Sequence, residues 1–497
     1  MPEARNYLAV DLGAESGRTI VGSLIDRKLT LSETHRFVNG PVRISDGVHW
    51  DILRLWSDIK TGIGMSSTKF NNELASLGLD TWGVDFALLD KNNSLLSNPF
   101  HYRDTRTDGM LEEAFKAVPR GEIFSSTGIQ FMQINTLYQL LAMVRNQDPI
   151  MDIAQTFLTI PDLFNFWLTG ELTNEFTNAT TTQCFNPSTR EWAKPLLERL
   201  NIPTHLFLPV TEPGTILGEL SPQDIRLSSS KPTYVVLPAC HDTGSAVVAV
   251  PAKNEDFAWL SSGTWSVMGA EVREPCLNEK ALEYNFTNEG GVFGTWRLSK
   301  NIMGLWLVQE CRREWMRQGE ELSFDALTQA AAESEAFAAV IDPDDVEFLH
   351  PGDMPSRIQK FCQDTDQPVP QTKGQIIRVA LESIALKYRF VLERLEELSG
   401  KKLDPLHIIG GGTQNRLLNQ FTADATKRTV VTGPVEATAI GNVLMQAIGL
   451  EHLGSLADAR DVVRLSFEVE EYHPKPDAGW DEAYAELLTL LNREGSE

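Results

Sequence analysis

The sequence predicts an α/β protein made of two related halves. Two segments, residues 7–21 and 257–268, share one pattern: an apolar strand, a turn rich in glycine and hydroxyl residues, and a second strand. Between them, the apolar strand at 234–237 leads into a turn that contains Asp242 and continues into a helix rich in small residues. Because each half contains such a turn, we expect a cleft between the halves that is suited to phosphate groups.

The first half is expected to begin with a hairpin. Alternating apolar residues at 8–10 and 19–24 predict its two strands, and a third strand follows at 29–37. Asp51 has the position of an N-cap, because the apolar residues that follow it fall on one face of a helix. A single long strand is then predicted at 77–89. Strands and helices that alternate in this way are typical of the α/β class.

The second half is expected to follow a polar loop at 251–256, so that the domains would comprise residues 1–250 and 251–497. Apolar periodicity at 375–398 predicts a long amphipathic helix, and Gly400 has the position of its C-terminal cap. Residues 110–230, within the first half, are richer in helix and loop.

The charge of the chain limits its partners. The 497 residues have a formal net charge of −24. Nucleic acid and anionic membranes are bound through clustered Lys and Arg, so neither is expected as a partner. The first six residues contain no apolar signal core, and no apolar run is long enough to span a membrane, so a cytoplasmic location is expected. Five widely spaced cysteines predict neither a disulfide framework nor a zinc site, and Cys240 is interpreted as a small buried residue.

The turn Asp11–Arg18 has the composition of a phosphate-binding loop. Its two glycines permit unusual backbone angles and close approach, so that main-chain amides and the Ser16 hydroxyl could face phosphate oxygens. Asp11, at the end of its strand, could hold Mg²⁺, usually through water. A plain hairpin turn could have the same sequence. The similar turn at 261–264 favours the phosphate interpretation.

Other nucleotide-binding designs fit less well. The chain contains neither the GxxxxGK[ST] P-loop nor the HRD motif of protein kinases. Residues 410–412 are three glycines between a strand and a helix, where a nucleotide could bind. Asn415 replaces the third glycine of GxGxxG, which disfavours a Rossmann dehydrogenase. A tight connection between strand and helix would explain the three glycines equally well.

Asp242 is a candidate general base for an alcohol, with His241 and a helix N-terminus shaping its electrostatic field. The alternative is an N-cap aspartate that contributes roughly 1 kcal/mol to stability and nothing to catalysis. Asp80 and Asp85 could instead form a carboxylate pair for glycoside hydrolysis. Their spacing on one strand would place them on opposite faces, which argues against that pair.

Taken in order, the motifs of this chain resemble those of the FGGY family of carbohydrate kinases, in the actin/Hsp70/hexokinase-like superfamily, and within it the branch that phosphorylates L-rhamnulose. The motifs are Asp80–Phe86, Tyr102–Arg106, Gly128–Phe131 with Asn135–Leu140, Thr177–Gln183, His241–Thr243, Ser261–Ser266, Asn301–Leu307, Gly410–Gly412 with Gln414–Asn415, and Gly433–Ala437. Together they cover nearly the whole chain.

The resemblance implies two ribonuclease-H-like domains that flank a central cleft. It implies transfer of the γ-phosphate of ATP, with Mg²⁺, to the 1-hydroxyl of L-rhamnulose in L-rhamnose catabolism, and it makes Asp242 the base. The sugar-binding positions that it implies are Gly83, His241, Asp242, Thr243 and Asn301, and the nucleotide-binding positions are Ala14, Glu15, Ser16, Gly17, Arg18, Thr264, Gln309 and Gly411.

Two of these positions have further interpretations. Glu15 stands where many superfamily members have a hydroxyl residue, and its carboxylate would repel a triphosphate unless it points away or helps to hold Mg²⁺. Asn301 could be an ordinary cap of the helix that follows it.

Alternative functions fit the same fold. A kinase for another ketose, such as L-fuculose or L-xylulose, would differ mainly in the segments 80–87, 128–136 and 177–183. An Hsp70-like ATPase or a sugar sensor without catalysis would leave Asp242 with no task. No additional C-terminal β domain for peptides is evident in the sequence.

Overall fold

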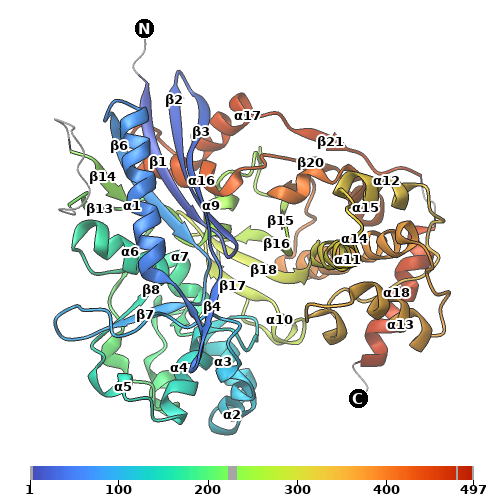
Figure 1. The fold of residues 1–497 in the computed structure, drawn as a ribbon, viewed down its shortest axis with the longest axis horizontal. Helices are drawn as coiled ribbons and strands as arrows, with labels where there is room; N and C mark the ends of the chain where they lie inside the picture. Colours follow the sequence, from blue (N-terminus) through green and yellow to red (C-terminus); the bar gives the residue numbers. More distant parts are fainter. Residues whose placement is uncertain (1–3, 222–231, 477–478, 495–497) are drawn as a thin grey trace. The chain divides into compact units, whose positions relative to one another are not determined.

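The computed structural model describes residues 4–221, 232–476 and 479–494 (Figure 1). The chain divides into two compact units. Unit 1 comprises Met1–Pro251, Glu271–Leu298 and Glu436–Phe467, and unit 2 comprises Ala252–Ala270, Ser299–Val435 and Glu468–Glu497. The first boundary lies beside the division expected at 250/251. The later segments Glu271–Leu298 and Glu436–Phe467 also belong to unit 1. A single boundary in the sequence therefore cannot describe the two units.

Unit 1 is built on a six-stranded sheet with the order β13-β14-β6-β1-β2-β3. Its strands are β1 (Arg5–Leu12), β2 (Ser16–Ile25), β3 (Lys28–Val38), β6 (Leu74–Thr81), β13 (Ile216–Glu219) and β14 (Tyr234–Val236). The strands β1, β6 and β14 are parallel, whereas β2, β3 and β13 run antiparallel to their neighbours. The carboxyl ends of the three parallel strands therefore lie at one edge of the sheet.

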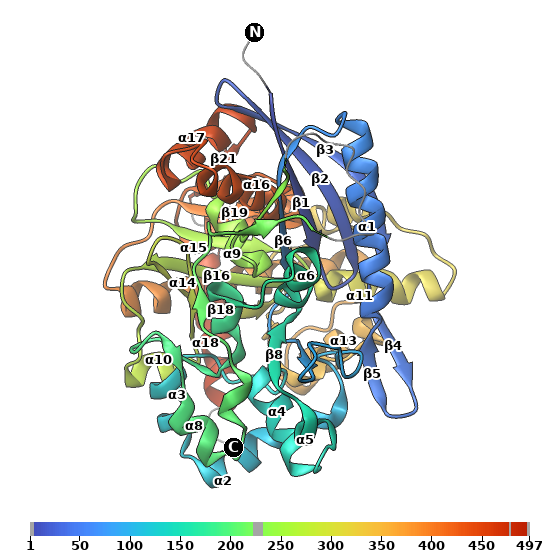
Figure 2. The same ribbon diagram turned by 90° about the vertical axis from the view of Figure 1, so that its left-hand side faces the viewer.

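Helices cover both faces of this sheet (Figure 2). On one face, apolar side chains of β1 pack with α1 (Ile52–Lys69) and α6 (Ile160–Thr169) in one buried cluster. Asp51 caps α1 as predicted, because its side chain accepts a hydrogen bond from the Arg54 amide at 3.2 Å. On the other face, α9 (Asp242–Val248) and α16 (Ala437–Gly449) pack on β6.

The small residues of α16 allow it to pack very closely against α9. A Cβ atom at Gly441 would lie only 1.7 Å from the carbonyl oxygen of Ser245 in α9. No larger residue fits at that position, because the neighbouring atom is rigid backbone. Close packing of these two helices holds the N-terminus of α9, and with it Asp242, against the end of the sheet.

The remaining elements of unit 1 are mostly short. This agrees with the helix- and loop-rich region expected from 110 to 230, of which residues 222–230 lie outside the described part of the chain. They are α2 (Met110–Ala117), α3 (Arg120–Thr127), α4 (Thr136–Arg145), α5 (Ile150–Ile153), α7 (Phe176–Ala179), α8 (Lys194–Arg199), α10 (Glu279–Glu283), α17 (Leu456–Ser466), β4 (Pro41–Ile44), β5 (Gly47–Trp50), β7 (Phe86–Leu89), β8 (Thr156–Thr159), β9 (Asn174–Glu175), β10 (Phe185–Asn186), β11 (Glu191–Trp192), β12 (Val210–Thr211) and β17 (Thr287–Gly290).

The single strand predicted at 77–89 is wrong. The chain leaves the sheet after β6 and forms β7, which pairs with β8 in a separate two-stranded sheet. Between β6 and β7, Val84 has φ of +66°, a left-handed conformation that interrupts an extended strand. The buried Asp85 carboxylate, which accepts hydrogen bonds from the indoles of Trp50 at 2.6 Å and Trp82 at 3.0 Å, holds this turn.

The core sheet of unit 2 repeats the arrangement of unit 1. The whole second sheet has the order β17-β18-β16-β15-β19-β20-β21, with β15 (Ala258–Ser262), β16 (Trp265–Val272), β18 (Trp296–Met303), β19 (Leu406–Ile409), β20 (Val430–Thr432) and β21 (Glu470–Tyr472). The strands β15, β19 and β20 are parallel, and β15 forms an antiparallel hairpin with β16. The prediction of two related halves is confirmed by this repeat.

The helices of unit 2 are α11 (Trp306–Arg317), α12 (Phe324–Ala332), α13 (Met354–Asp364), α14 (Lys373–Ser399), α15 (Arg416–Thr426) and α18 (Trp480–Glu494). The long helix α14 is the one predicted from apolar periodicity. A capping box between Thr372 and Gln375 begins it, and Gly400 ends it with φ of +67°.

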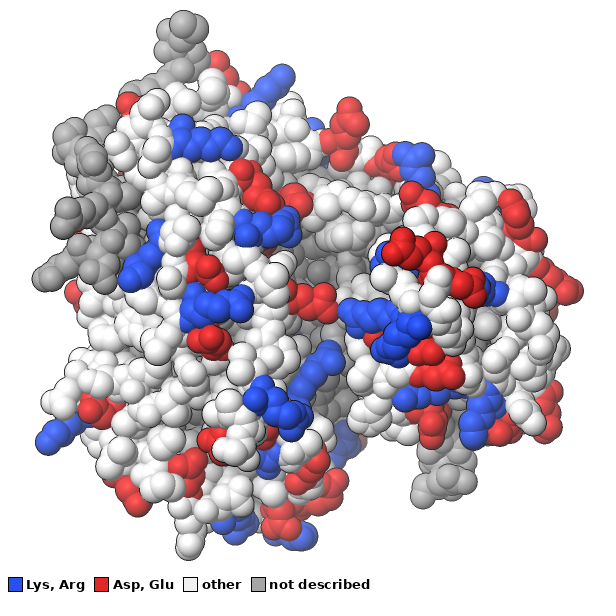
Figure 3. All heavy atoms as spheres, viewed as in Figure 1, with Lys and Arg blue, Asp and Glu red and all other residues white. Residues whose placement is uncertain are grey.

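Positive and negative side chains lie among one another on the faces of the two units that Figure 3 shows. Several form surface pairs, such as Arg36 with Glu33 at 2.6 Å and Arg416 with Glu470 at 2.6 Å. Of the helices in the described part of the chain, none is long and apolar enough to cross a membrane. All five cysteines are free in this structure.

Candidate active site

The ends of the three parallel strands of unit 1 bring acidic residues together. Asp11 at the end of β1 lies opposite Asp80 at the end of β6 in the parallel register. One residue further, Thr81 forms an isolated parallel bridge with His241, and the Thr81 amide donates to the Cys240 carbonyl at 2.9 Å. Asp242 follows directly. Residues from three separate parts of the sequence therefore meet at one edge of the sheet.

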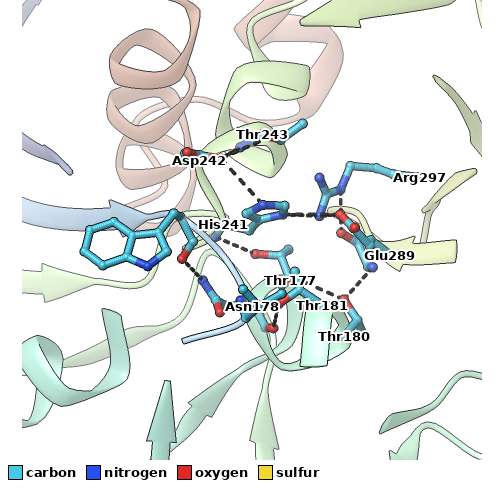
Figure 4. Close-up of polar contacts among 12 residues, drawn as sticks. Thr177, Asn178, Thr180, Thr181, His241, Asp242, Thr243, Glu289 and Arg297 are labelled. Carbon is cyan, nitrogen blue, oxygen red and sulfur yellow. Dashed lines mark hydrogen bonds and ion pairs between the residues drawn. The ribbon is translucent and has the colours of Figure 1, made fainter. Parts of the chain in front are cut away.

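Asp242 is the first residue of α9, and its side chain is 31% exposed (Figure 4). Oδ1 accepts hydrogen bonds from the Thr243 amide at 2.5 Å and from the Thr243 hydroxyl at 3.0 Å. No described residue donates a hydrogen bond to Oδ2. Burial raises the pKa of Asp242, and the charge of Asp11 raises it further. The N-cap of α9 is His241, so the alternative of an N-cap aspartate is wrong.

His241 lies between Asp242 and an ion pair from β17 and β18. Nε2 is 3.5 Å from Asp242 Oδ1, and Nδ1 is 3.0 Å from Arg297 Nη2 and 3.3 Å from Glu289 Oε2. Burial alone would raise the pKa of Glu289, but Arg297 and His241 outweigh it and lower that pKa to about 2. Glu289 therefore stays ionised beside the imidazole.

The backbone around His241 is hydrogen-bonded to a second buried carboxylate, that of Glu175, directly and through Thr177. Glu175 Oε2 accepts from the Cys240 amide at 3.2 Å and from the Thr177 hydroxyl at 2.7 Å. The same hydroxyl accepts from the His241 amide at 3.1 Å. Burial raises the pKa of Glu175 to about 8. Cys240 is fully buried with a raised thiol pKa, so its interpretation as a small buried residue is confirmed.

Gly83 packs against the hydroxyl-rich segment that precedes Cys184. A Cβ atom at Gly83 would lie 2.9 Å from the Thr181 hydroxyl, and that hydroxyl accepts from the Val84 amide at 3.1 Å. Asn178 donates to the Trp82 carbonyl at 3.3 Å. These contacts bring together the turn after β6 and the segment at 177–183, two of the segments in which a kinase for another ketose was expected to differ.

The turn between β1 and β2 is a tight, hydrogen-bonded hairpin. The Gly13 amide donates to the Ser16 carbonyl at 2.9 Å, and Asn39 binds the turn through the carbonyls of Gly13 and Glu15. Neither glycine of the turn has a positive φ, so the expected unusual backbone angles are wrong. Gly17 is required by close approach instead, because a Cβ there would lie 2.3 Å from the Phe37 ring. Glu15 is exposed.

Arg18 joins this turn to the acidic residues. Its guanidinium pairs with Asp11 at 2.7 Å and with Glu436, which precedes α16, at 2.5 Å. Burial disfavours the charged guanidinium, but Asp11 and Glu436 outweigh this and raise its pKa. The Asp11 carboxylate predicted to bind Mg²⁺ is therefore engaged by an arginine in this structure.

The donor set near Asp11 suits Mg²⁺. Within residues 4–221, 232–476 and 479–494, no three His, Cys, Asp or Glu side chains group so as to hold a metal ion by themselves. Mg²⁺ typically keeps several waters and uses one or two carboxylates together with substrate phosphates. Asp11 provides one carboxylate, and the buried Oδ1 of the adjacent Asp80 has no hydrogen-bond partner among the described residues. These oxygens fit the ion.

The predicted nucleotide-binding residues of unit 2 lie around the end of β15. The Thr264 hydroxyl donates to the Gln309 side chain at 3.1 Å, and the Trp306 amide donates to the Thr264 carbonyl at 3.1 Å. The three glycines follow β19, the neighbour of β15, and a Cβ at Gly412 would lie 2.0 Å from the Ser262 hydroxyl. Gly411 beside it is exposed.

Asn301 lies within β18 in unit 2, whereas Gly83, His241 and Thr243 belong to unit 1. The alternative that Asn301 caps the following helix is wrong, because α11 begins at Trp306 and its N-cap is Leu305. Capping of α11 is therefore not the role of Asn301.

Three charged residues of the site, Glu175, Glu289 and Arg297, were not predicted from the sequence. Each stands in a strand and is buried or nearly so. A charged residue flanked by apolar strand residues, as in Trp296-Arg297-Leu298, was the available signal, since charged residues are rarely buried without a partner.

Comparison with known proteins divides the chain near residue 250. Residues 6–249 match the model of the N-terminal domain of the FGGY family of carbohydrate kinases, and residues 258–450 match that of its C-terminal domain. This chain belongs to the FGGY family of carbohydrate kinases. The two matched ranges cover most of the chain and meet between β14 and β15.

Curated relatives in this family are similar along almost their whole length. A rhamnulokinase from Bacteroides thetaiotaomicron is 43% identical over 480 residues, which cover 97% of this chain and 98% of the relative. A rhamnulokinase from Oceanobacillus iheyensis is 42% identical over 465 residues, which cover 94% of this chain and 97% of the relative.

Solved structures share the fold of this FGGY kinase at low sequence identity. A ligand-bound xylulose kinase from Lactobacillus acidophilus has a TM-score of 0.84 at 16% identity and covers 99% of both chains. A glycerol kinase from Plasmodium falciparum with ADP has a TM-score of 0.78 at 15% identity, covering 99% of this chain and 98% of its own. The two-domain carbohydrate kinase fold expected from the sequence is confirmed.

Proposed function

We propose that this protein transfers the γ-phosphate of ATP to the 1-hydroxyl of L-rhamnulose and releases L-rhamnulose 1-phosphate and ADP, a step of L-rhamnose catabolism. Rhamnulokinases that are 42–43% identical over nearly the full chain support this substrate. The observation that carries the proposal is Asp242, a half-buried carboxylate at a helix N-terminus whose Oδ2 accepts no hydrogen bond from the described residues.

Asp242 acts as the general base in this proposal. Oδ2 takes the proton from the 1-hydroxyl of the sugar as the O–H bond breaks. The electron pair on that oxygen then forms the new bond to the γ-phosphorus, while the bond from phosphorus to the β–γ bridging oxygen breaks and ADP leaves. The raised pKa of Asp242 makes it a stronger base than an ordinary aspartate.

Sugar binding is proposed for Gly83, His241, Thr243 and Asn301. The absence of a side chain at Gly83 allows its backbone to pack closely against Thr181. His241 and Thr243 flank the base and supply polar groups for neighbouring hydroxyls, which matter because an unpaired buried hydroxyl costs roughly 1–3 kcal/mol. Asn301 supplies an amide from unit 2.

Nucleotide binding is proposed for Ala14, Glu15, Ser16, Gly17 and Arg18 in unit 1 and for Thr264, Gln309 and Gly411 in unit 2. Asp11 would hold Mg²⁺, with Asp80 beside it. When bound, Mg²⁺ neutralises phosphate charge during phosphoryl transfer. Arg18, which pairs with Asp11 in this structure, supplies a further positive charge near the phosphates. Because both ATP and the sugar are metabolites of the cell interior, we place the enzyme in the cytoplasm.

The test is ADP release from Mg-ATP with L-rhamnulose, L-fuculose, L-xylulose, D-xylulose and glycerol, with the phosphorylated position assigned by NMR. A strong preference for L-rhamnulose with phosphate on O1 is the expected result. Preference for L-fuculose or L-xylulose would retain Asp242 as the base and overturn the substrate. No sugar-dependent turnover with any of the five would overturn the kinase activity itself.

A further inference from the structure

A buried ion pair lies behind His241, on the side away from Asp242 (Figure 4). Arg297 in β18 is fully buried, and its Nη2 lies 3.1 Å from Oε2 of Glu289 in β17. Arg297 Nε donates to the Gly290 carbonyl at 2.9 Å. The guanidinium is thus held from two sides by neighbouring strands of the same unit.

The contacts of this pair determine where the imidazole carries its proton. Arg297 Nη2 lies 3.0 Å from His241 Nδ1, and a guanidinium can only donate hydrogen bonds. Nδ1 of the neutral ring must therefore accept, which places the proton on Nε2. If the ring gains a second proton, Nδ1–H faces Glu289 Oε2 at 3.3 Å. In both states Nε2–H is directed at Asp242, 3.5 Å from Oδ1.

The orientation of Asp242 follows from these contacts. The Thr243 amide and hydroxyl both donate to Oδ1, and Nε2–H of His241 faces the same oxygen. All three donors lie on one side of the carboxylate. Oδ2 is therefore the oxygen that remains for a proton from substrate.

We propose that Glu289 and Arg297 are positioning residues that hold His241 with Nδ1 as an acceptor and Nε2–H towards Asp242 Oδ1, so that Oδ2 is presented to the sugar hydroxyl. The pair acts through His241. This role rests on the proposed function, in which Asp242 is the base.

A contribution to the stability of the fold does not by itself explain why Glu289 and Arg297 form a buried ion pair. A buried salt bridge contributes little net stability, because the desolvation of two charges offsets their attraction. Arg297 also carries a buried Nη1 without a hydrogen-bond partner among the described residues, which adds to that cost. An ion pair with such a cost, in contact with the residue next to the base, is explained by the orientation that it imposes.

The experiment uses the full-length protein and two variants, Glu289→Gln and Arg297→Lys. The first readout is ¹⁵N NMR of the histidine side chains, with the His241 signals assigned by their loss in His241→Asn. In the wild type we expect Nδ1 to have the shift of an unprotonated ring nitrogen. In Arg297→Lys and Glu289→Gln we expect both ring nitrogens to move towards the values of a tautomer mixture.

The second readout is steady-state kinetics with L-rhamnulose and ATP. We expect kcat to fall about 10-fold or more in both variants, part of the roughly 10²–10⁴-fold that a general base contributes, with a smaller change in KM for ATP. Glu396→Gln is the matched control, because Glu396 forms another partly buried pair, with Arg428 at 2.8 Å, in unit 2. It should leave the His241 signals and kcat unchanged.

Three outcomes would overturn the proposal. The first is that His241 of the wild type carries its proton on Nδ1. This measurement needs neither variant, so it tests the proposal even if Arg297→Lys does not fold. The others are unchanged His241 signals in both variants, or an unchanged kcat in both. Failure of the proposed function is separate: a wild type that phosphorylates none of the sugars would remove the kinetic readout, and the tautomer readout would still test the positioning of His241.

Discussion

Asp11 and Asp80 are paired with each other in the register of the adjacent parallel strands β1 and β6. Asp80 is fully buried, its Oδ2 accepts from Asn442 at 2.6 Å, and its Oδ1 has no partner among the described residues. Burial raises the pKa of Asp80 well above its usual range, and the charge of Asp11 adds to the shift. Two acidic residues at paired positions, one of them fully buried, are costly to ionise together and suited to a cation.

Asp80→Asn is therefore expected to stabilise the fold at high pH. When folding raises the pKa of an acid, the free energy of unfolding decreases as the pH rises from the pKa in the unfolded state to the pKa in the folded state. Asparagine does not ionise, so the variant does not lose this free energy. The unfolding temperature of the variant should exceed that of the wild type at pH 8 by more than it does at pH 5. Asp152→Asn, at an exposed carboxylate, is the control. An equal difference at both pH values would contradict the raised pKa.

Asp242→Asn should abolish turnover while both substrates still bind. The amide keeps the size of the side chain but cannot take the hydroxyl proton, so kcat should fall by about 10²–10⁴-fold or more. Calorimetric titration with ATP and with the sugar should give dissociation constants within a few-fold of the wild type. Near-normal kcat in this variant would remove Asp242 from the role of base.

The acidic limb of the kcat–pH profile should lie above the usual pKa of aspartate, about 4. Asp242 must be ionised to accept a proton, so kcat falls as the pH drops below its raised pKa. The Thr243 hydroxyl stabilises the ionised form, and Thr243→Val should move the limb to still higher pH. The profile is measured at saturating sugar, so that weaker binding does not affect it. A limb that stays in place would show that this hydrogen bond does not tune the base.

Gly83→Ala should weaken sugar binding. The added Cβ would lie 2.9 Å from the Thr181 hydroxyl and 3.1 Å from Thr181 Cβ, so the turn after β6 must shift. Overpacking of this kind typically costs about 1–3 kcal/mol. KM for the sugar should rise while KM for ATP changes little. The double variant with Thr181→Ala removes the closest atom and should recover part of the loss; no recovery would place the cause elsewhere.

Glu175 should make the protein less stable as the pH rises. Its folded pKa of about 8 lies above the usual glutamate value, so the folded state binds this proton more tightly than the unfolded state. The free energy of unfolding should therefore fall between about pH 4 and pH 8. Glu175→Gln should flatten this slope, measured by urea unfolding at several pH values. An unchanged slope would show that Glu175 does not titrate in this range.

Local sequence patterns were sufficient to predict many of the elements and to nominate much of the candidate site. The hairpins at both phosphate-type turns, the capped helix after Asp51, the long helix that ends before Gly400 and the turn before Asp242 all follow from periodicity and from residues with particular backbone preferences. These signals act within a few residues, so they can be recognised without the fold. The series of family motifs then identified the FGGY kinase.

Only the tertiary structure decided which charges share a site. Arg297 reaches His241 across 56 positions of sequence, and Arg18 pairs with Glu436 from a segment that returns to unit 1 late in the chain. Val84 and the buried Asp85 break what looked like one strand. Burial and compensation of a charge depend on neighbours that are distant in sequence, and no local pattern records them. The sequence by itself determined the fold class, the family and Asp242 as the candidate base, whereas the fold determined how that carboxylate is held.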